Sequence, residues 1–427
     1  MNDRIDVHFS TGDDSIRVGS MLDVGDGPWF EYAPEFIETG IELSPIKLPL
    51  RAAAFEPGPH ALGRLRGLFA DTVPTGWGRR LLDQALRDAG HDPRRVSPLM
   101  RLRAVGARGM GALTYRPAMP DPPLGPADLD ARDLQALAAQ AFRVDANELE
   151  QIPPALARAG SVSGGVRPKL VLAWRDDGAV ADAFGVLPPG HRHVLVKFRA
   201  STDWVDLPAI ECAYLDMAHD AGLAVPPHRL VKLGRGKRSE LALVIDRFDR
   251  EGEERRHVHT LAGVLEIDHQ RDLVDYRALM DVAMRLTHDV REIQAAWLRA
   301  VFNVAVSNRD DHAQNIAFLM RADGRWSLAP AYDLTFSKGA GGYHTMSVDG
   351  ESRAPTRAHL LRLAVAGQLD RATAVASLDR VREVVSRWER YADAAQVSRA
   401  HRNEIATALA TQDADLAAGR TSAPIVA

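Results

Sequence analysis

The sequence predicts an α+β protein in which a strand-rich region precedes a mainly helical one. Short apolar runs bounded by Gly, Asp and Pro recur between residues 169 and 248, as expected of strands. After about residue 257, apolar residues recur every three to four positions, as expected of amphipathic helices. The 427 residues are sufficient for two or three domains with sizeable cores.

The composition is that of a globular protein, with 46% hydrophobic and 26% charged residues, which excludes bulk disorder. A formal net charge of -4 disfavours a dedicated DNA-binding protein. We expect a cytoplasmic protein without membrane contact, because no run approaches the ~20 apolar residues of a membrane span and the start lacks a signal-peptide pattern. The single cysteine, Cys212, excludes an intramolecular disulfide and a cysteine-based zinc cluster.

Residues 1–118 are expected to form a mixed α/β N-terminal part. Short extended segments and turns come first, and a helix follows at 76–88 with Leu81, Leu82 and Leu86 on one side. Proline fixes φ and removes a backbone donor, so the proline-rich stretch 117–126 is interpreted as a linker. The connecting region 119–150 leads into the next part of the chain, and helices are expected at 127–140 and 146–158.

Residues 151–250 are expected to form a strand-rich lobe. Its four strands are predicted at 169–174, 193–198, 228–233 and 241–248. A helix lies between the second and third strands, with Asp206 as its cap, Pro208 in its first turn and Gly222 just past its end.

Residues 251–427 are expected to form a helical lobe. Its helices are predicted at 272–286, 289–307, 357–366, 371–391 and 398–411. A hairpin turn at 321–324 with a returning strand at 326–329 interrupts them.

The most informative polar segment runs from Asn308 to Asn315, between a long amphipathic helix and an apolar run. Asp310 precedes Asn315 by five residues, a spacing that occurs in kinase catalytic loops. There the carboxylate lies near an attacking hydroxyl and the amide oxygen binds magnesium. Asp333, at the end of the returning strand, is a candidate for a second Mg²⁺ ligand, since Mg²⁺ prefers oxygen donors. An Asx turn or helix cap is the alternative for each.

Upstream, Gly164 and Gly165 lie in a small-residue loop that leads into a strand at Lys169, so its backbone N–H groups are candidates for binding a polyphosphate. An ordinary loop is the alternative. Lys197 lies in the next strand, where a lysine considered alone more often faces solvent. It is one of only six lysines among 53 basic residues, which raises the weight of a phosphate-binding role. Glu211 follows on a helix, where it either pairs with such a lysine or faces solvent.

The strand that ends in Asp246, Arg247 and Phe248 occupies the place where a two-lobed kinase binds adenine, although its charges also fit the solvent face of an edge strand. The candidate segments follow a fixed order along the chain, namely a flexible loop, a strand lysine, a helix glutamate, a hinge strand, the Asp-x4-Asn loop and a final Asp. Because phosphoryl transfer needs mainly positioning and charge neutralisation, the set predicts transfer from ATP with Mg²⁺.

These segments resemble the HipA family of bacterial serine/threonine kinases. The resemblance rests on 308–315, 330–333, 247–250 and 164–169, and extends to the N-terminal segments 44–50 and 71–79. It implies a two-part HipA-like kinase fold with a nucleotide lobe and a catalytic helical lobe.

The resemblance also implies residue roles. Asp310 is the expected catalytic base, Asn315 and Asp333 the magnesium ligands, and Lys197 the phosphate-binding lysine, while His312 supports the loop or the nucleotide. The phosphate loop spans Gly164, Gly165, Val166, Arg167 and Lys169. The family phosphorylates a serine of this loop, and both Ser161 and Ser163 fall in the matching stretch, which is about one residue longer than the usual form.

Family members typically act as growth-inhibiting toxins of toxin-antitoxin systems, neutralised by a small DNA-binding HipB-like antitoxin. The resemblance therefore implies that this chain contacts DNA only through such a partner, and that its protein substrate is translation-related, such as an aminoacyl-tRNA synthetase. Two other hypotheses about the function stay open at this point. One is a pseudokinase that acts as the partner of a DNA-binding repressor. The other is a metal-dependent hydrolase built from Asp310, Asp311, His312 and Asp333.

Overall fold

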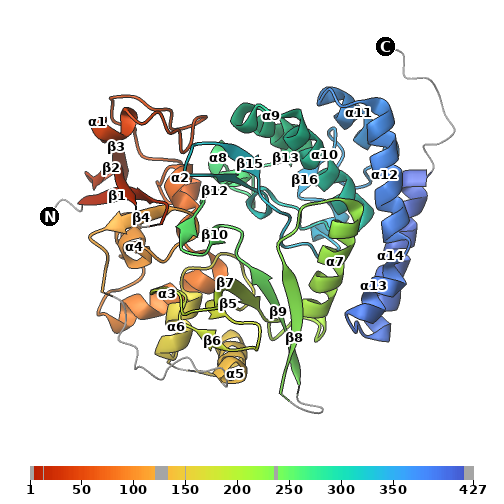
Figure 1. The fold of residues 1–427 in the computed structure, drawn as a ribbon, viewed down its shortest axis with the longest axis horizontal. Helices are drawn as coiled ribbons and strands as arrows, with labels where there is room; N and C mark the ends of the chain where they lie inside the picture. The colour runs from red at the N-terminus through yellow and green to blue at the C-terminus, as the bar shows by residue number, and fades with distance from the viewer. Residues whose placement is uncertain (1–3, 13, 121–132, 150, 235–238, 418–427) are drawn as a thin grey trace. The chain divides into compact units, whose positions relative to one another are not determined.

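The computed structural model describes residues 4–12, 14–120, 133–149, 151–234 and 239–417. The chain forms two compact units, whose elements are labelled in Figure 1. Unit 1 comprises 1–208, 227–268 and 319–325, and unit 2 comprises 209–226, 269–318 and 326–427. Among the described residues, no helix combines the length and apolar character needed to cross a membrane.

Unit 1 begins with a four-stranded antiparallel sheet in the order β3-β2-β1-β4. The strands are β1 (Arg4–Ser10), β2 (Ser15–Asp23), β3 (Pro28–Tyr32) and β4 (Leu113–Arg116). Between β3 and β4 lie the helices α1 (Pro34–Ile37), α2 (Gly67–Ala70), α3 (Gly76–Asp88) and α4 (Pro98–Val105). The predicted mixed α/β N-terminal part is therefore present, and α3 has the predicted bounds.

A five-stranded antiparallel sheet, in the order β6-β5-β7-β9-β8, forms the second part of unit 1. Its strands are β5 (Lys169–Trp174), β6 (Val180–Ala181), β7 (Arg192–Lys197), β8 (His228–Leu233) and β9 (Glu240–Asp246). Short elements accompany it, namely α5 (Asp133–Asp145), α6 (Pro154–Gly160), β10 (Arg250–Glu251), β11 (Glu254–Arg255), β12 (His257–Thr260) and α8 (Leu261–Leu265). Trp77 and Leu81 of α3 share one core with Leu156 of α6 and Leu170 of β5, so the N-terminal part and the sheet are packed together.

Unit 2 is mainly helical, and α7 (Leu207–Ala221) enters it from unit 1. Its other helices are α9 (Tyr276–Thr287), α10 (Val290–Ala305), α11 (Arg357–Ala366), α12 (Arg371–Val385), α13 (Trp388–Ala394) and α14 (Arg399–Ala417). The strands β13 (Val274–Asp275) and β16 (Met346–Ser347) pair in parallel, and β14 (Ala317–Met320) and β15 (Trp326–Leu328) form the predicted hairpin.

Several predicted boundaries are wrong. The helix expected at 398–411 continues to Ala417, and the strand expected at 241–248 ends at Asp246. Three other differences have a local cause. The helix expected at 146–158 begins only at Pro154, because Asn147 has φ +59° and proline suits a first turn rather than an interior. The helix expected at 371–391 is two helices, broken where Arg387 leaves helical dihedrals. The helix expected at 272–286 begins only at Tyr276, because Val274 and Asp275 form the short strand β13 and Asp275 caps the helix.

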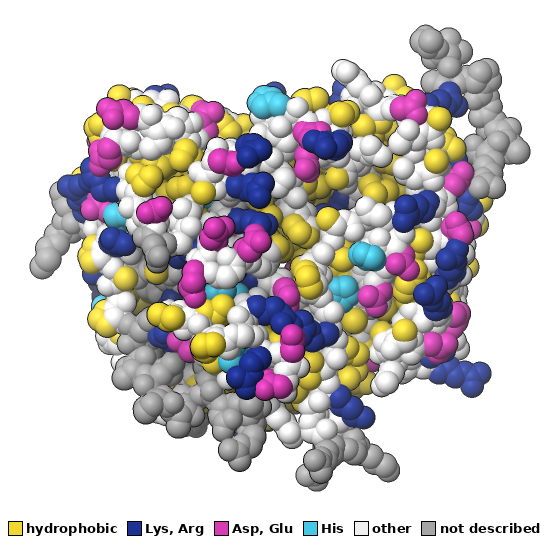
Figure 2. All heavy atoms as spheres, viewed as in Figure 1, with side chains coloured by type: hydrophobic (Ala, Val, Ile, Leu, Met, Phe, Trp, Pro, Cys, Tyr) yellow, Lys and Arg dark blue, Asp and Glu magenta, His cyan; other side chains and the backbone are white. Residues whose placement is uncertain are grey.

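The helix expected at 127–140 begins outside the described residues and continues to Asp145. Most of the predicted linker, 117–126, also lies outside them. On the face in Figure 2, basic and acidic side chains are interspersed, as the small net charge of -4 leads one to expect.

Candidate functional site

The residues singled out from the sequence form two groups, one in each unit, which are described separately. In unit 2 the central feature is the segment 308–315 that follows α10. A second segment, 332–337, runs beside it, since Ser337 N–H donates to Ser307 O (3.1 Å) and Arg309 N–H to Ser337 O (3.4 Å). The Tyr332 hydroxyl also donates to Gln314 O (3.0 Å). These bonds place Asp333 on the segment that lies against the Asp-x4-Asn loop.

Three oxygen-bearing side chains of these segments are those predicted to take part in catalysis or metal binding. The Asp310 side chain is 52% exposed, with His312 Nε2 3.9 Å from its Oδ1. Asn315 Nδ2 donates to Asp310 O (3.1 Å), which leaves its amide oxygen outside this bond. Asp333 has φ +53°, a left-handed conformation that a non-glycine residue adopts at a cost and that is enriched at functional sites.

Asn315 and Asp333 therefore fit a magnesium ion, because they supply an amide oxygen and a carboxylate from adjoining segments. Hard oxygen donors of this kind, completed by phosphates and waters, are the usual Mg²⁺ ligands in phosphotransferases.

Asp311 is a site residue whose role the sequence does not reveal. It is 1% exposed, and its Oδ2 accepts from the Tyr276 hydroxyl (2.9 Å) and from His344 Nδ1 (3.0 Å). Its Oδ1 accepts from the N–H groups of Thr345 (2.8 Å) and Met346 (3.3 Å). Burial, and then the charge of Asp311, raise the pKa of Tyr276 well above its usual range, so the phenol stays a donor.

Asp311 thus fastens the loop to the segment 344–346, and both of its oxygens are committed. This removes one member of the metal-dependent hydrolase set. Only the positions of Tyr276 and His344 in the folded chain reveal this role, since both lie more than 30 residues away in sequence.

His312 is mostly buried, with 21% of its side chain exposed. Its ring lies 4.8 Å from the ring of His269, centroid to centroid. Its Nδ1 has no hydrogen-bond partner among the residues that the structure describes. The role of His312 in supporting the loop or the nucleotide stays a prediction.

In unit 1, the candidate phosphate loop packs tightly before β5. Ser161 and Ser163 are 2% and 6% exposed, whereas Val166 is 80% exposed and directs its side chain to solvent. Gly165 has φ +84°, and a Cβ built on it would lie 2.5 Å from Lys169 Nζ. Arg167 Nε donates to Asp203 Oδ2 (2.9 Å).

Lys169 and Lys197 are paired across β5 and β7, and both are buried. Residues paired in this way share one face of a sheet. The solvent-exposed alternative for Lys197 is therefore wrong. Two buried ammonium groups on one face, next to a glycine turn that a side chain would fill, fit a polyphosphate.

The predicted hinge strand, β9, lies between β7 and β8, so the edge-strand alternative is wrong. Asp246 accepts from Arg192 Nε (3.0 Å). Arg247 is buried and donates through Nε and Nη2 to Asp249 (2.9 and 2.7 Å). Burial alone would raise the pKa of Asp249, but Arg247 and Arg250 outweigh it and hold the pKa well below its usual range. The Arg247 side chain is therefore a structural partner of Asp249, and Phe248 beside it is half-buried.

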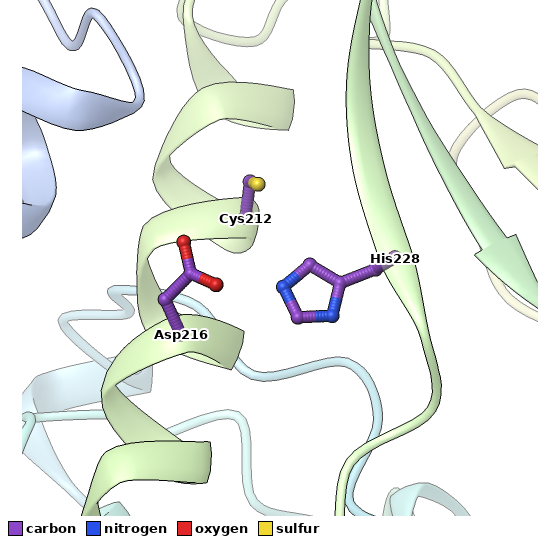
Figure 3. A group of neighbouring side chains, drawn as sticks. All are labelled: Cys212, Asp216 and His228. Atoms are coloured by element: carbon purple, nitrogen blue, oxygen red, sulfur yellow. The ribbon is translucent and has the colours of Figure 1, made fainter.

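Glu211 is 8% exposed on α7, so the solvated alternative for this residue is also wrong. It lies in unit 2 and Lys197 in unit 1, and their pairing stays a prediction. On the same helix, Cys212 and Asp216 lie one turn apart on one side, and His228 begins β8 (Figure 3). Two donors from one helix, one of them a buried cysteine, do not make a metal site within unit 2.

Comparisons with known proteins identify the family. A model described as the HipA-like C-terminal domain matches residues 161–388, more than half of the chain. A second, the HipA N-terminal domain, matches residues 13–116. The chain belongs to the HipA family. A search of curated proteins finds no match.

The comparison with solved structures finds a similar fold. HipA from the Shewanella oneidensis MR-1 complex of HipA, HipB and operator DNA is similar with a TM-score of 0.67 and 20% identity, covering 96% of this chain and 95% of that one. The Helicobacter pylori proinflammatory kinase CtkA gives a TM-score of 0.39 and 11% identity, covering 60% of this chain and 90% of that one. The predicted α+β, two-part HipA-like fold is therefore confirmed.

Proposed function

We propose that this HipA family chain is an ATP-dependent protein serine/threonine kinase. The observation that supports this best is the catalytic loop of unit 2. There an exposed Asp310, an oriented Asn315 and a strained Asp333 lie on adjoining segments, and the buried Asp311 holds the loop in place. Membership of the HipA family also supports the proposal.

In the proposed mechanism, Asp310 accepts the proton of the attacking serine or threonine hydroxyl. Lys169 and Lys197 bind the phosphates of ATP, and the turn at Gly165 allows the backbone to approach them. Asn315 and Asp333 would hold Mg²⁺, which when bound neutralises charge on the β- and γ-phosphates. The residues of this chain thus mainly position the reactants and compensate charge, which is what phosphoryl transfer needs.

We further propose that the kinase phosphorylates its own phosphate loop at Ser161 or Ser163. Both serines are buried, and Ser163 Oγ donates to Gly160 O (2.8 Å). The segment must therefore leave this position before either hydroxyl can receive a phosphoryl group. A phosphate added there would lie beside the site proposed for ATP phosphates and repel them.

The biological setting is proposed from the similar structure, in which HipA was solved with HipB and operator DNA. We infer a growth-inhibiting toxin that a small HipB-like antitoxin neutralises, with DNA contacted through that partner. The substrate is inferred to be a translation-related protein such as an aminoacyl-tRNA synthetase.

The proposal is tested by incubating the purified chain with Mg²⁺ and γ-labelled ATP, beside the variant Asp310→Ala. Mass spectrometry of the peptide that contains Ser161 and Ser163 locates the label. We expect label in the wild type and none in the variant. Absence of label on the wild type and on added protein substrates, in a preparation that binds ATP and starts unphosphorylated, would favour a pseudokinase that acts as the partner of a repressor.

A further inference from the structure

The start of helix α3 holds the phosphate loop through backbone and side-chain hydrogen bonds. Gly165 N–H donates to Thr75 Oγ1 (3.0 Å), and Trp77 N–H donates to Gly165 O (2.8 Å). The Trp77 indole N–H donates to Lys169 O (3.0 Å). Thr75 and Trp77 thus fix both polar groups of the Gly165 peptide backbone and the carbonyl of the residue that begins β5.

Two glycines of the same segment allow this close approach. A Cβ built on Gly78 would lie 2.0 Å from Ser163 O, and one built on Gly76 would lie 2.4 Å from Gly165 O. Both distances are far below any ordinary contact. Any side chain at either position would therefore push the loop away, which makes the loop position dependent on residues nearly 90 positions upstream.

The segment that makes these contacts is itself firmly anchored. Trp77 is 2% exposed and packs in the core of unit 1 with Leu81 and Leu170. Arg108, also in the N-terminal part, donates to Ser161 Oγ (3.2 Å) at the other end of the loop. The loop is therefore hydrogen-bonded to residues that are themselves packed in the core of unit 1.

We propose that Thr75, Gly76, Trp77 and Gly78, here named the clamp, are positioning residues that set the phosphate loop for MgATP. The N-terminal part then contributes to nucleotide affinity although none of its side chains needs to touch the nucleotide. One consequence is that Gly165 N–H, committed to Thr75, is not a phosphate donor in this conformation, so the clamp also selects which loop groups meet the phosphates. The effect on nucleotide binding rests on the proposed kinase function, whereas the effect on the loop does not.

The test uses full-length Thr75→Val, which removes the acceptor at nearly constant shape, and Gly78→Ala, which adds one methyl group against Ser163 O. The matched controls are Thr202→Val, at an exposed residue, and Gly185→Ala, where an added Cβ meets no atom within 4 Å. Trp77→Phe serves as a third variant, since it removes the indole donor and keeps a smaller aromatic ring in the core.

Hydrogen exchange of the nucleotide-free protein measures the clamp directly. Loss of one buried hydrogen bond is expected to speed exchange in the peptide spanning 161–169 by about tenfold, while the β7 peptide stays unchanged. The dissociation constant of MgATP, measured in the same variants, is expected to rise by a similar factor, and the control variants should match the wild type.

The outcomes separate this proposal from the kinase proposal. Unchanged exchange in Thr75→Val and Trp77→Phe would overturn the clamp, and so would faster exchange with unchanged MgATP affinity. If Gly78→Ala does not fold, the other two variants decide. If the wild type binds no MgATP, the kinase proposal fails and the role of the clamp in nucleotide binding is overturned with it. Faster exchange in Thr75→Val would then leave only a structural attachment of the loop.

Discussion

Two neighbouring aspartates of the segment 308–315 have opposite environments. Asp310 is half exposed, whereas Asp311 is buried and accepts four hydrogen bonds. The exposed carboxylate of Asp310 suits the proposed role of catalytic base, whereas the carboxylate of Asp311 holds the loop in place. The sequence offers the same side chain twice and does not distinguish them, because the donors to Asp311 come from residues distant in the chain.

This contrast gives a prediction for the pair of variants Asp310→Asn and Asp311→Asn. Asp311→Asn would set an amide N–H₂ against buried donors, so we expect the free energy of unfolding to fall by about 2–4 kcal/mol. Asp310→Asn should change it by less than about 0.5 kcal/mol, as expected of an exposed position. Urea unfolding of both variants, followed by circular dichroism, checks this. An equal decrease in the free energy of unfolding in the two variants would show that the buried hydrogen bonds of Asp311 do not contribute to stability.

At the residue scale, burial and ion pairing exclude some of the alternatives that the sequence left open. The rarity of lysine favoured a site role for Lys197, and its burial excludes the solvent-facing alternative. The guanidinium of Arg247 is committed to Asp249, so any contact of this residue with adenine would come from its backbone. The pairing of Arg247 with Asp249 depends on the backbone conformation between them, which the order of residue types does not predict.

At the scale of elements, the sequence predicts boundaries well where glycine, proline or a capping side chain marks them. Helices α3 and α11 and strands β5 and β8 have the predicted bounds. The break between α12 and α13 has no such marker. Trp388, just after the break, is buried and donates its indole N–H to Arg402 O (3.1 Å), so packing against α14 decides where the helix stops.

The hydrogen bonds between the segments 332–337 and 308–315 support a prediction. Tyr332→Phe removes the bond from the hydroxyl to Gln314 O while it preserves the ring. We expect the Mg²⁺ concentration for half-maximal kinase activity to rise about threefold to tenfold, with activity at saturating Mg²⁺ nearly unchanged, because one hydrogen bond contributes about 1 kcal/mol. Tyr343→Phe, at a largely exposed tyrosine, is the control. An unaltered Mg²⁺ dependence in Tyr332→Phe would show that this bond does not position Asp333.

At the scale of the whole molecule, buried histidines make stability depend on pH. Burial, and then the charge of His259, lower the pKa of His257 to about 3, and burial with Arg247 lowers the pKa of His193 to about 4. Below pH 6.5 the unfolded chain binds protons at these residues that the folded chain does not. The contribution of these two histidines to the free energy of unfolding is therefore fully present well above pH 6.5. It is lost as the pH falls from there towards 4.

We expect the free energy of unfolding to fall by roughly 2 kcal/mol between pH 7 and 5, allowing for solvent screening at the partly exposed His193. His257→Gln, which keeps a donor for Leu43 O, should flatten this slope. Urea midpoints measured at half-unit pH steps test it. A slope identical to that of the wild type would mean that His257 is not neutral in the fold.

The joint core of unit 1 leads to a prediction about the separability of the N-terminal part. Family models match residues 13–116 and 161–388 as two regions, yet Trp77 and Leu81 of the first are buried with Leu170 and Val196 of the second. Removing residues 1–118 would expose this apolar surface to water. We expect the remaining fragment to bind a hydrophobic dye and to unfold without cooperativity, and the full-length Trp77→Ala variant to lose about 3–5 kcal/mol of stability. Adding residues 1–118 as a separate chain should restore cooperative unfolding, because the lost contacts are non-covalent. A fragment that unfolds cooperatively at the midpoint of the full chain would show instead that the sheet of unit 1 is stable without α3.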